Sequence, residues 1–274
     1  MRRWKTERVE LRAKGGERLV ECVARRAGSK KRAKRLIDEG LVSVNGQKEL
    51  LARRRLKGGE VVRFPLTEAP FKPPNVKLLF RERGVWVFEK PPFITTNEGE
   101  KSLEETVRKL FNPNLKVVHR LDKQTTGPVI AVESEKLFEA FKKQFKRREV
   151  KKEYLCLVKG KLRSRQTVRR PIDGKSAVSL VTPLEHFKRA TLCRVEIETG
   201  RKHQIRRHLA SVGYPVVGEF LYYRGSWPEE LLFCPRIALH FRKLSFTHPA
   251  TGKRITVESE LPKDLKEFIG ELER

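Results

Sequence analysis

One acidic side chain, Asp122, stands among cations at the end of a strand-like run. Residues 116–132 read KVVHRLDKQTTGPVIAV, in which two β-branched runs flank a polar loop. Loops held by rigid strands often carry chemistry, and His119, Arg120 and Lys123 favour the ionised carboxylate. An ionised Asp can act as a nucleophile. For this segment alone, the alternative is a turn residue that pairs with Arg120.

A second polar cluster lies in residues 199–213, TGRKHQIRRHLASVG. Three arginines beside a glycine turn and a helix N-terminus suit a phosphate or a carboxylate. A zinc site is not expected, because His203 and His208 are five positions apart and no Cys or Glu completes a ligand set at a recognisable interval. A basic surface helix is the alternative for this segment alone. Its polar side chains are Arg201, His203, Gln204, Arg206, Arg207 and His208.

The composition indicates a nucleic-acid partner. The 274 residues contain 62 Lys and Arg against 34 Asp and Glu, giving a net charge of +28 and a pI near 10.3. No apolar run reaches the roughly 18 residues that span a bilayer, and secretion is not expected because the first residues have no apolar core before a small-residue cleavage site. Four isolated cysteines predict reduced, buried thiols in a cytoplasmic protein rather than a disulfide framework. They are Cys22, Cys156, Cys193 and Cys234.

The front of the chain predicts a small basic module. After a basic tail over 1–14, a compact unit is expected over 15–64, and residues 1–64 hold 20 basic and 8 acidic side chains. Capping residues, apolar periodicity and the Asn45-Gly46 turn signal predict its elements. These are a helix over 17–27, a second helix over 30–39 capped by Ser29, a hairpin signalled by residues 41–46 with its turn at Asn45-Gly46, and a strand over 60–64.

This module resembles the small RNA-binding domain named for ribosomal protein S-four. The resemblance is carried by ERLVECVARRAGSKKRAKRLIDEGLVSVNGQ followed by GGEVV, with Val20 where that family usually has an acid. It implies salt-dependent contacts with RNA phosphates. A solvated basic helix or a nuclear-import patch is the alternative. The expected RNA-binding residues are Lys30, Lys31, Arg32, Lys34, Arg35, Arg53, Arg54 and Arg55.

A proline-rich linker is expected over 65–78, followed by a large domain over 79–274. Strands and helices alternate there without regular βαβ spacing, and the late chain is mainly strand. This pattern predicts an α+β fold with a mixed, largely antiparallel sheet and flanking helices. The expected elements include helices over 102–111 and 134–148 and strands over 153–160, 177–182, 190–198, 237–246 and 253–258.

Three segments of the large domain, taken in order, resemble the signature motifs of the RluA family of pseudouridine synthases. They are HRLDKQTTG, KKEYLCLVKG and TGRKHQIRRHLASVGYPVVGE. The resemblance implies that Asp122 is the catalytic aspartate, Tyr154 the active-site tyrosine and Arg206 the arginine that pairs with the aspartate. It further implies motif positions, with less defined roles, for His119, Arg120, Leu121, Thr126, Gly127, Arg201, His203 and Gln204.

The implied activity is isomerisation of uridine in structured RNA, without cofactor or metal. The uridine must swing out of its stack, and its bond from base nitrogen to sugar is broken and replaced by a bond to carbon. Asp122 would attack either the sugar or the uracil ring, aimed by a bidentate pair with Arg206. Tyr154 would stack on the base or help to move a proton.

The front module and the family favour large-subunit ribosomal RNA as the substrate of a monomeric enzyme, with tRNA as the alternative. A non-catalytic RNA-binding or ribosome-assembly factor and a DNA-binding regulator are the alternatives from other classes. The chain departs from the family pattern at Thr126, where Ser is usual, and at Pro128, where an aliphatic residue is usual. The usual Lys-Pro-x-Gly turn is replaced by residues 90–93, Lys-Pro-Pro-Phe.

Overall fold

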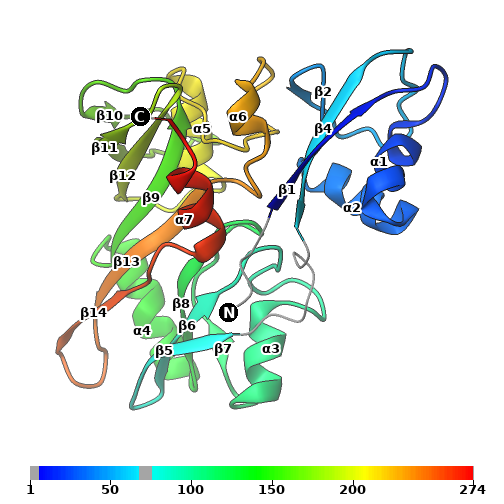
Figure 1. The fold of residues 1–274 in the computed structure, drawn as a ribbon. Helices are drawn as coiled ribbons and strands as arrows, with labels where there is room; N and C mark the ends of the chain where they lie inside the picture. Colours follow the sequence, from blue (N-terminus) through cyan, green and yellow to red (C-terminus); the bar gives the residue numbers. More distant parts are fainter. Residues whose placement is uncertain (1–5, 68–75, 274) are drawn as a thin grey trace.

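The computed structural model describes residues 6–67 and 76–273 (Figure 1). Residues 6–67 form the front module, a four-stranded antiparallel sheet in the order β1-β4-β2-β3 with two helices packed against it. The elements are β1 (Thr6–Arg12), α1 (Leu19–Ala27), α2 (Lys30–Asp38), β2 (Ser43–Val44), β3 (Gln47–Lys48) and β4 (Val61–Thr67).

Apolar periodicity and caps explain the two helices of the front module. Leu19 of α1, Ile37 of α2 and Phe64 of β4 are fully buried in one cluster. The hydroxyl oxygen of Ser29 accepts a hydrogen bond from the backbone N–H of Arg32 at 3.1 Å, which confirms the expected cap of α2. The basic side of α2 is thereby turned away from the sheet.

The expected basic tail over 1–14 is wrong where the structure describes it. Residues 6–12 form strand β1, which pairs antiparallel along β4 with Val9 opposite Phe64 and Leu11 opposite Val62. Polar and apolar side chains alternate in this segment, as they do in a strand with one buried face. The high density of charge hides that alternation in the sequence.

The Asn45-Gly46 hairpin is confirmed. Asn45 and Gly46 have φ angles of 50° and 82°, the left-handed pair that a two-residue hairpin turn requires, and they connect β2 to β3. The expected linker over 65–78 begins inside β4 and ends inside β5, which starts at Lys77. Its middle, 68–75, lies outside the described residues.

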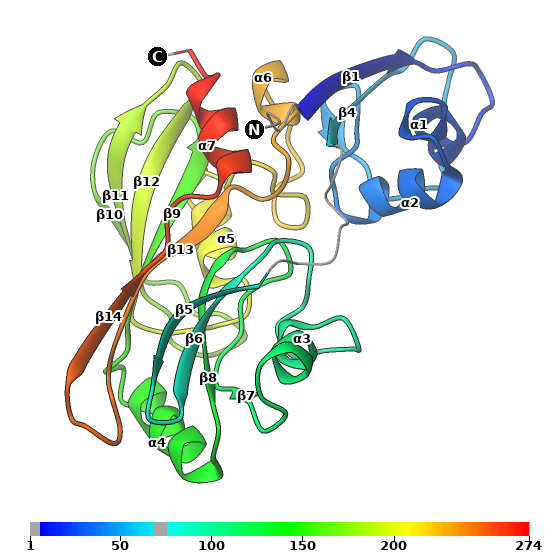
Figure 2. The same cartoon turned by 60° about the horizontal axis from the view of Figure 1, so that its bottom comes forward.

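Residues 76–273 form the large module, which contains two antiparallel sheets (Figure 2). One sheet has the order β5-β6-β8-β7, with β5 (Lys77–Glu82), β6 (Val85–Lys90), β7 (Lys116–Val117) and β8 (Gly127–Val132). The other has the order β10-β11-β12-β9-β13-β14, with β9 (Lys151–Lys159), β10 (Gln166–Val168), β11 (Ser179–His186), β12 (Ala190–Ile197), β13 (Leu239–Thr247) and β14 (Arg254–Glu258).

The two sheets meet where β8 begins beside β13. A parallel bridge links Thr126 to His240, and the backbone N–H of Phe241 donates to the carbonyl oxygen of Thr126 at 2.8 Å. Gly127 is required at this junction, because a Cβ atom there would lie 2.3 Å from the carbonyl oxygen of Phe241. The expected α+β class with largely antiparallel strands is confirmed, in the form of two joined sheets.

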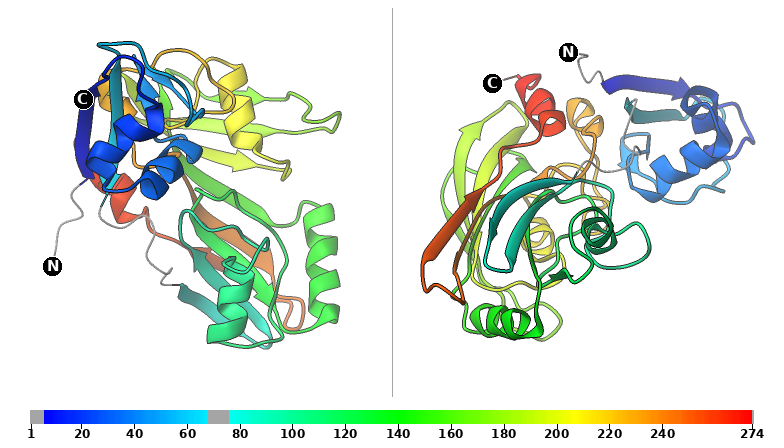
Figure 3. Two further views of the ribbon diagram at one scale, coloured as in Figure 1. Left: turned by 90° about the vertical axis from the view of Figure 1, so that its right-hand side faces the viewer. Right: turned by 90° about the horizontal axis from the view of Figure 1, so that it is seen from below.

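Five helices of the described chain flank these sheets. They are α3 (Leu103–Leu110), α4 (Glu135–Lys146), α5 (Gln204–Ser211), α6 (Glu229–Leu232) and α7 (Lys263–Gly270). The front module sits beside α6, at the end of the large module remote from α4 (Figure 3). Across residues 6–67 and 76–273, no helix combines the length and apolar character that a membrane crossing requires.

Candidate active site

A cleft of about 440 Å³ opens where the two sheets of the large module meet. Two loops and the first turn of α5 form its rim, while β9 contributes the aromatic ring of Tyr154. Its lining includes Thr96, Asp122, Tyr154, Arg201, His203 and Arg206. The three signature segments therefore converge on one site.

Asp122 lies in the loop between β7 and β8, and its neighbours anchor that loop. The hydroxyl of Thr96 accepts a hydrogen bond from the backbone N–H of Leu121 and donates one to its carbonyl oxygen, both at 3.0 Å. The backbone N–H of Thr125 donates to the carbonyl oxygen of Asp122 at 3.0 Å. The side chain of Asp122 retains 25% exposure, so a fixed backbone presents a carboxylate that a substrate can reach.

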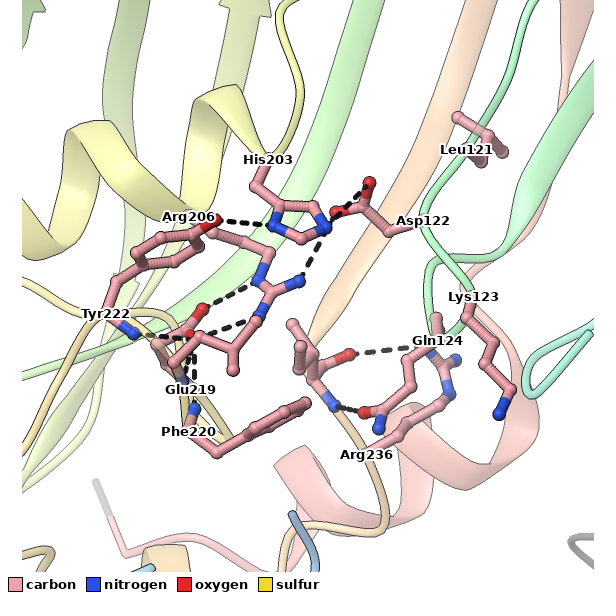
Figure 4. A network of polar contacts seen from close by, with 12 residues as sticks. Leu121, Asp122, Lys123, Gln124, His203, Arg206, Glu219, Phe220, Tyr222 and Arg236 are labelled. Atoms are coloured by element: carbon pink, nitrogen blue, oxygen red, sulfur yellow. Dashed lines mark hydrogen bonds and ion pairs between the residues drawn. The ribbon is translucent and has the colours of Figure 1, made fainter. Parts of the chain in front are cut away.

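The guanidinium of Arg206 in α5 and the imidazole of His203, at the N-cap of this helix, face this carboxylate. Nη1 of Arg206 lies 3.6 Å from Oδ2 of Asp122, and Nε2 of His203 lies 3.7 Å from Oδ1 (Figure 4). The expected pairing of Arg206 with Asp122 is present, but the expected bidentate geometry is wrong. The planar fork of Arg206 bonds Glu219 instead, with Nε donating to Oε2 at 2.7 Å and Nη2 to Oε1 at 2.9 Å.

Glu219 explains why the guanidinium is fixed. Its carboxylate is fully buried and also accepts backbone N–H groups from Phe220, Leu221 and Tyr222 at 2.9, 2.7 and 3.2 Å. Burial opposes its charge, but Arg206 and these donors outweigh burial and lower the pKa of Glu219. Burial also opposes the charge of Arg206, whose pKa is nevertheless raised by Glu219 and Asp122. One nitrogen of a locked guanidinium is thus left for Asp122.

Tyr154 supplies a neutral aromatic surface beside Asp122. Its ring stacks on Phe241 with centroids 4.5 Å apart and an interplanar angle of 11°. Burial, assisted by the negative charge of Asp122, raises the pKa of the Tyr154 phenol above its usual range. The side chain therefore remains a phenol at neutral pH, able to pack against a base or to donate a hydrogen bond.

His203 lines the cleft, and Tyr222 packs against His203 and Arg206. His203 adopts a left-handed conformation with φ of 54° at the N-cap of α5, and its Nδ1 lies 2.6 Å from the hydroxyl oxygen of Tyr222. The guanidinium carbon of Arg206 lies 5.4 Å from the Tyr222 ring centroid. Sequence reasoning assigned no role to Tyr222 or Glu219, although Glu219 ends the third signature segment.

Three motif residues support the loop from behind rather than line the cleft. Nε2 of His119 accepts the backbone N–H of Ile130 at 3.1 Å. The hydroxyl of Thr126 is hydrogen-bonded to Nδ1 of His240 at 2.9 Å, and Gly127 permits the close approach of β13. Their contacts explain their place in the motif, because each fixes the strand that carries the Asp122 loop.

The remaining motif residues divide between the cleft wall and its support. Arg120 lines the cleft, exposed and paired with Glu98 at 2.9 Å, and Leu121 lines it as a buried side chain. Arg201 reaches the carbonyl oxygen of Ser176 at 3.2 Å. Gln204 lines the cleft too, but its buried amide donates to the carbonyl oxygen of Val178 at 2.9 Å and so anchors the start of α5.

Lys90 is a support that sequence reasoning missed. It opens the atypical 90–93 turn, is fully buried, and donates from Nζ to the carbonyl oxygens of Pro91 and Lys123 at 2.8 and 3.1 Å. Burial lowers its pKa to about 7. The amine therefore ties this turn to the residue directly after Asp122.

The expected RNA-binding residues of the front module differ in accessibility. The side chains of Lys30 and Lys34 are 73% and 63% exposed, and Lys31 is exposed beside them. Arg54 is instead held between two carboxylates, Glu49 at 2.8 Å and Glu60 at 2.7 Å. Its role at RNA phosphates stays a prediction, for a guanidinium whose charge is already paired within the module. Arg55 donates to the carbonyl oxygen of Gly16 at 3.1 Å.

Comparisons with known proteins show the family of the chain. Residues 84–211 match the family model described as RNA pseudouridylate synthase. An uncharacterized RNA pseudouridine synthase of Helicobacter pylori is 34% identical over 232 residues, which cover 79% of this chain and 88% of that protein. Ribosomal large subunit pseudouridine synthase D of Nitrosomonas europaea is 31% identical over 274 residues, covering 88% and 79%.

A solved human structure has the same fold. Human RNA pseudouridylate synthase domain containing 1 superposes with a TM-score of 0.62 at 24% identity, covering 73% of this chain and 90% of that one. Identity and coverage of the relatives, together with the family match, place this chain among them. The protein belongs to the RluA family of RNA pseudouridine synthases, the isomerases that convert uridine in RNA to pseudouridine.

Proposed function

We propose that this enzyme isomerises uridines of large-subunit ribosomal RNA, with Asp122 as the nucleophile. The observation that carries the proposal is the placement of Asp122, a reachable carboxylate on an anchored loop, 3.6 Å from a guanidinium that Glu219 immobilises. The ribosomal target is supported by relatives named ribosomal large subunit pseudouridine synthase D in Nitrosomonas europaea and Vibrio cholerae.

The cleft suits a single flipped nucleoside. Its volume of about 440 Å³ lies within the range of small-ligand sites, and Tyr154 offers a ring on which a base can pack. Asp122 attacks the sugar or the uracil ring, the bond from base nitrogen to sugar breaks, and the base turns and rejoins through carbon. The bond to Asp122 then breaks, the ring carbon loses its proton and the freed base nitrogen gains one, so the overall reaction is an isomerisation. Arg206 stabilises the carboxylate before attack and holds its direction.

The front module supports an RNA substrate. We assign it as an S-four-like RNA-binding domain whose exposed lysines on α2, at Lys30, Lys31 and Lys34, lie against phosphates. Arg32 and Arg35 share this helix, and Arg53 is exposed in the loop before β4. The proposed partner is structured RNA bound by a single copy of the chain.

Pseudouridine mapping in a strain that lacks this chain tests both target and nucleophile. Wild-type protein should restore the missing large-subunit sites, whereas Asp122→Asn should lower the conversion rate at least about 10³-fold. Asp38→Asn, which changes an exposed acid on α2, is the matched control and should restore every site.

The outcomes separate the alternatives. Restored sites in tRNA would replace the ribosomal target, and conversion by Asp122→Asn would remove the nucleophile assignment. RNA binding by wild-type protein without any converted uridine in either RNA would favour a non-catalytic assembly factor.

A further inference from the structure

The front module contacts the large module directly beside the catalytic loop. Glu39, which follows α2, is only 5% exposed, and its carboxylate accepts the ammonium of Lys123. The side-chain amide of Gln124 donates to the carbonyl oxygen of Glu39 at 2.7 Å and to its Oε2 at 3.2 Å. The two residues that Glu39 holds are the two that follow Asp122 in the chain.

Gln124 joins this contact to the large module (Figure 4). Its side-chain oxygen accepts the backbone N–H of Ile237 at 2.8 Å, and its carbonyl oxygen accepts Nη1 of Arg236 at 3.1 Å. Arg236 is fully buried and bonds Asp264 of α7 twice, at 2.6 and 3.1 Å. The loop is therefore fixed from the front module, from the start of β13 and from α7 at once.

A second contact lies on the opposite, arginine-bearing side of the cleft. Gly40 has φ of 68°, and a Cβ atom there would lie 2.3 Å from the ring of Phe220. Phe220 follows Glu219, and its ring centroid is 5.6 Å from the guanidinium carbon of Arg206. Two adjacent residues of the front module therefore contact the surroundings of both members of the catalytic pair: Glu39 bonds the two residues that follow Asp122, and Gly40 meets Phe220, whose ring lies beside Arg206.

A third contact between the modules comes from the turn at residues 90–93. The side chain of Phe93 is 7% exposed and belongs to the hydrophobic cluster of the front module, although the residue lies in the large module's part of the chain. Phe93 is the last residue of the turn that Lys90 opens, and Lys90 donates to the carbonyl oxygen of Lys123. Packing of Phe93 therefore couples the front module to the same loop by a second route.

Electrostatics make the Glu39 contact selective for one arrangement. A buried carboxylate is costly unless it is paired and hydrogen-bonded, and in the docked arrangement Lys123 and Gln124 satisfy Glu39. Such a pair contributes more to orientation than to net stability. Because a displacement of about 1 Å in a reacting group can cost about 100-fold in rate, orientation at this position matters for chemistry.

We propose that the front module is a positioning element of the active site, in addition to its role in binding RNA. Docked, it holds the Asp122 loop through Glu39 and the Glu219 segment through Gly40, so the rate of isomerisation depends on docking. This inference rests on the proposed role of Asp122. Glu39 is a positioning residue that acts through Lys123 and Gln124, since it does not line the cleft.

Glu39→Ala in the full chain tests the proposal, with Asp38→Ala as the matched control. Both variants remove one negative charge from the end of α2, but Asp38 is exposed and pairs with Lys34. In Glu39→Ala, amide hydrogen exchange should accelerate at residues 121–126, including the Thr125 amide that bonds Asp122. The single-turnover rate on a ribosomal RNA fragment at saturation should fall about 10-fold, while the Kd for RNA matches that of the control.

A glycine pair provides a second test that does not depend on charge. Gly40→Ala and Gly28→Ala both place a Cβ atom at a positive φ after a helix, so both should lower Tm through the same backbone strain, and the clash at Gly40 should lower it further. Gly28 has no atom within 4 Å of the added Cβ, whereas Gly40 meets Phe220. Only Gly40→Ala should therefore accelerate exchange in the loop and lower the rate at saturating RNA. Glu39→Gln, which keeps acceptor oxygen, should recover part of the rate.

Three outcomes of these experiments would count against the proposals. Exchange at 121–126 that is the same in Glu39→Ala as in Asp38→Ala overturns the proposal, even if no RNA fragment is converted by wild-type protein. Absence of conversion by wild-type protein would instead count against the proposed function. A weaker Kd with an unchanged rate at saturation would make Glu39 an RNA-binding or purely structural residue, which also overturns the proposal.

Discussion

The cleft and the basic face of α2 both concentrate positive charge, but they hold it in opposite ways. In the cleft, the side chain of Arg206 is 4% exposed, is bonded twice to Glu219 and faces Asp122. On α2, the side chains of Lys30 and Lys34 are 73% and 63% exposed, and their acidic partners, Glu21 and Asp38, are partly exposed as well.

This difference separates two uses of charge. A buried cation with fixed partners acts on one atom in one direction, and water and salt screen it little. Exposed lysines act on any phosphate within reach, and salt weakens their contribution. Substitutions in the cleft should therefore change the rate at saturating RNA, whereas substitutions on α2 should change affinity and its dependence on salt.

Among the substitutions that test this difference, Arg206→Lys should lower the reaction rate most. Lysine keeps the charge but lacks the planar fork that bonds Glu219 twice while leaving one nitrogen for Asp122. The single-turnover rate at saturating RNA should fall about 100-fold or more, with Kd changed less than about threefold. A rate loss that disappears at low salt would show that the charge in the cleft behaves like the charge on α2.

Arg207→Lys is the matched control for that measurement. Arg207 is the next residue of α5, and it pairs with Asp173, whose side chain is 69% exposed. Its replacement should leave the rate within about twofold, because a surface ion pair contributes little. Equal losses in the two variants would assign the effect to α5 as a whole.

Neutralising the exposed lysines of α2 should weaken RNA binding and leave the reaction rate at saturating RNA unchanged. Lys30→Gln combined with Lys31→Gln should raise Kd for RNA about tenfold near physiological salt and reduce the salt slope by about 1.5, since each phosphate contact contributes about 0.7–0.9. The rate at saturation should stay unchanged. Lys263→Gln with Lys266→Gln, a matched pair on α7, should change the slope less.

Local pattern was enough to predict the loop that presents Asp122 and the strand that carries Tyr154. The β-branched runs around residues 118–126 and the alternation around Tyr154 are short-range signals. The basic segment over 6–12 was misjudged because charge density obscured an alternating pattern that is completed only when β4 pairs with it.

Long-range contacts could not be predicted. The acidic partner of the Arg206 fork lies thirteen positions away across a turn, and Glu39 lies 84 positions before Lys123. Nothing in either segment distinguishes these buried carboxylates from surface acids before the fold is known. Likewise, a motif shows that His119 and Asp122 belong together, but not that one supports the strand while the other faces the cleft.

The smallest expected effect is a loss of folding stability at low pH through buried histidines. This effect belongs to the large module, because all six histidines follow residue 118. Burial lowers the pKa of His119 to about 3 and that of His240 to about 4. Between those values and the ordinary value near 6.5, the unfolded chain binds more protons than the folded one. The free energy of unfolding should therefore fall as pH drops below 6.5, by up to about 1.4 kcal/mol per pH unit for each histidine.

Urea unfolding at pH 7 and pH 5 measures this slope, and His119→Gln should reduce it. A glutamine oxygen can still accept the backbone N–H of Ile130 that Nε2 of His119 accepts, but it binds no proton in this range. His186→Gln, at an exposed histidine, is the control and should keep the wild-type slope. If His119→Gln kept the full slope as well, the acid sensitivity would have to arise elsewhere, and buried groups of the large module would no longer differ from exposed ones in their response to protons.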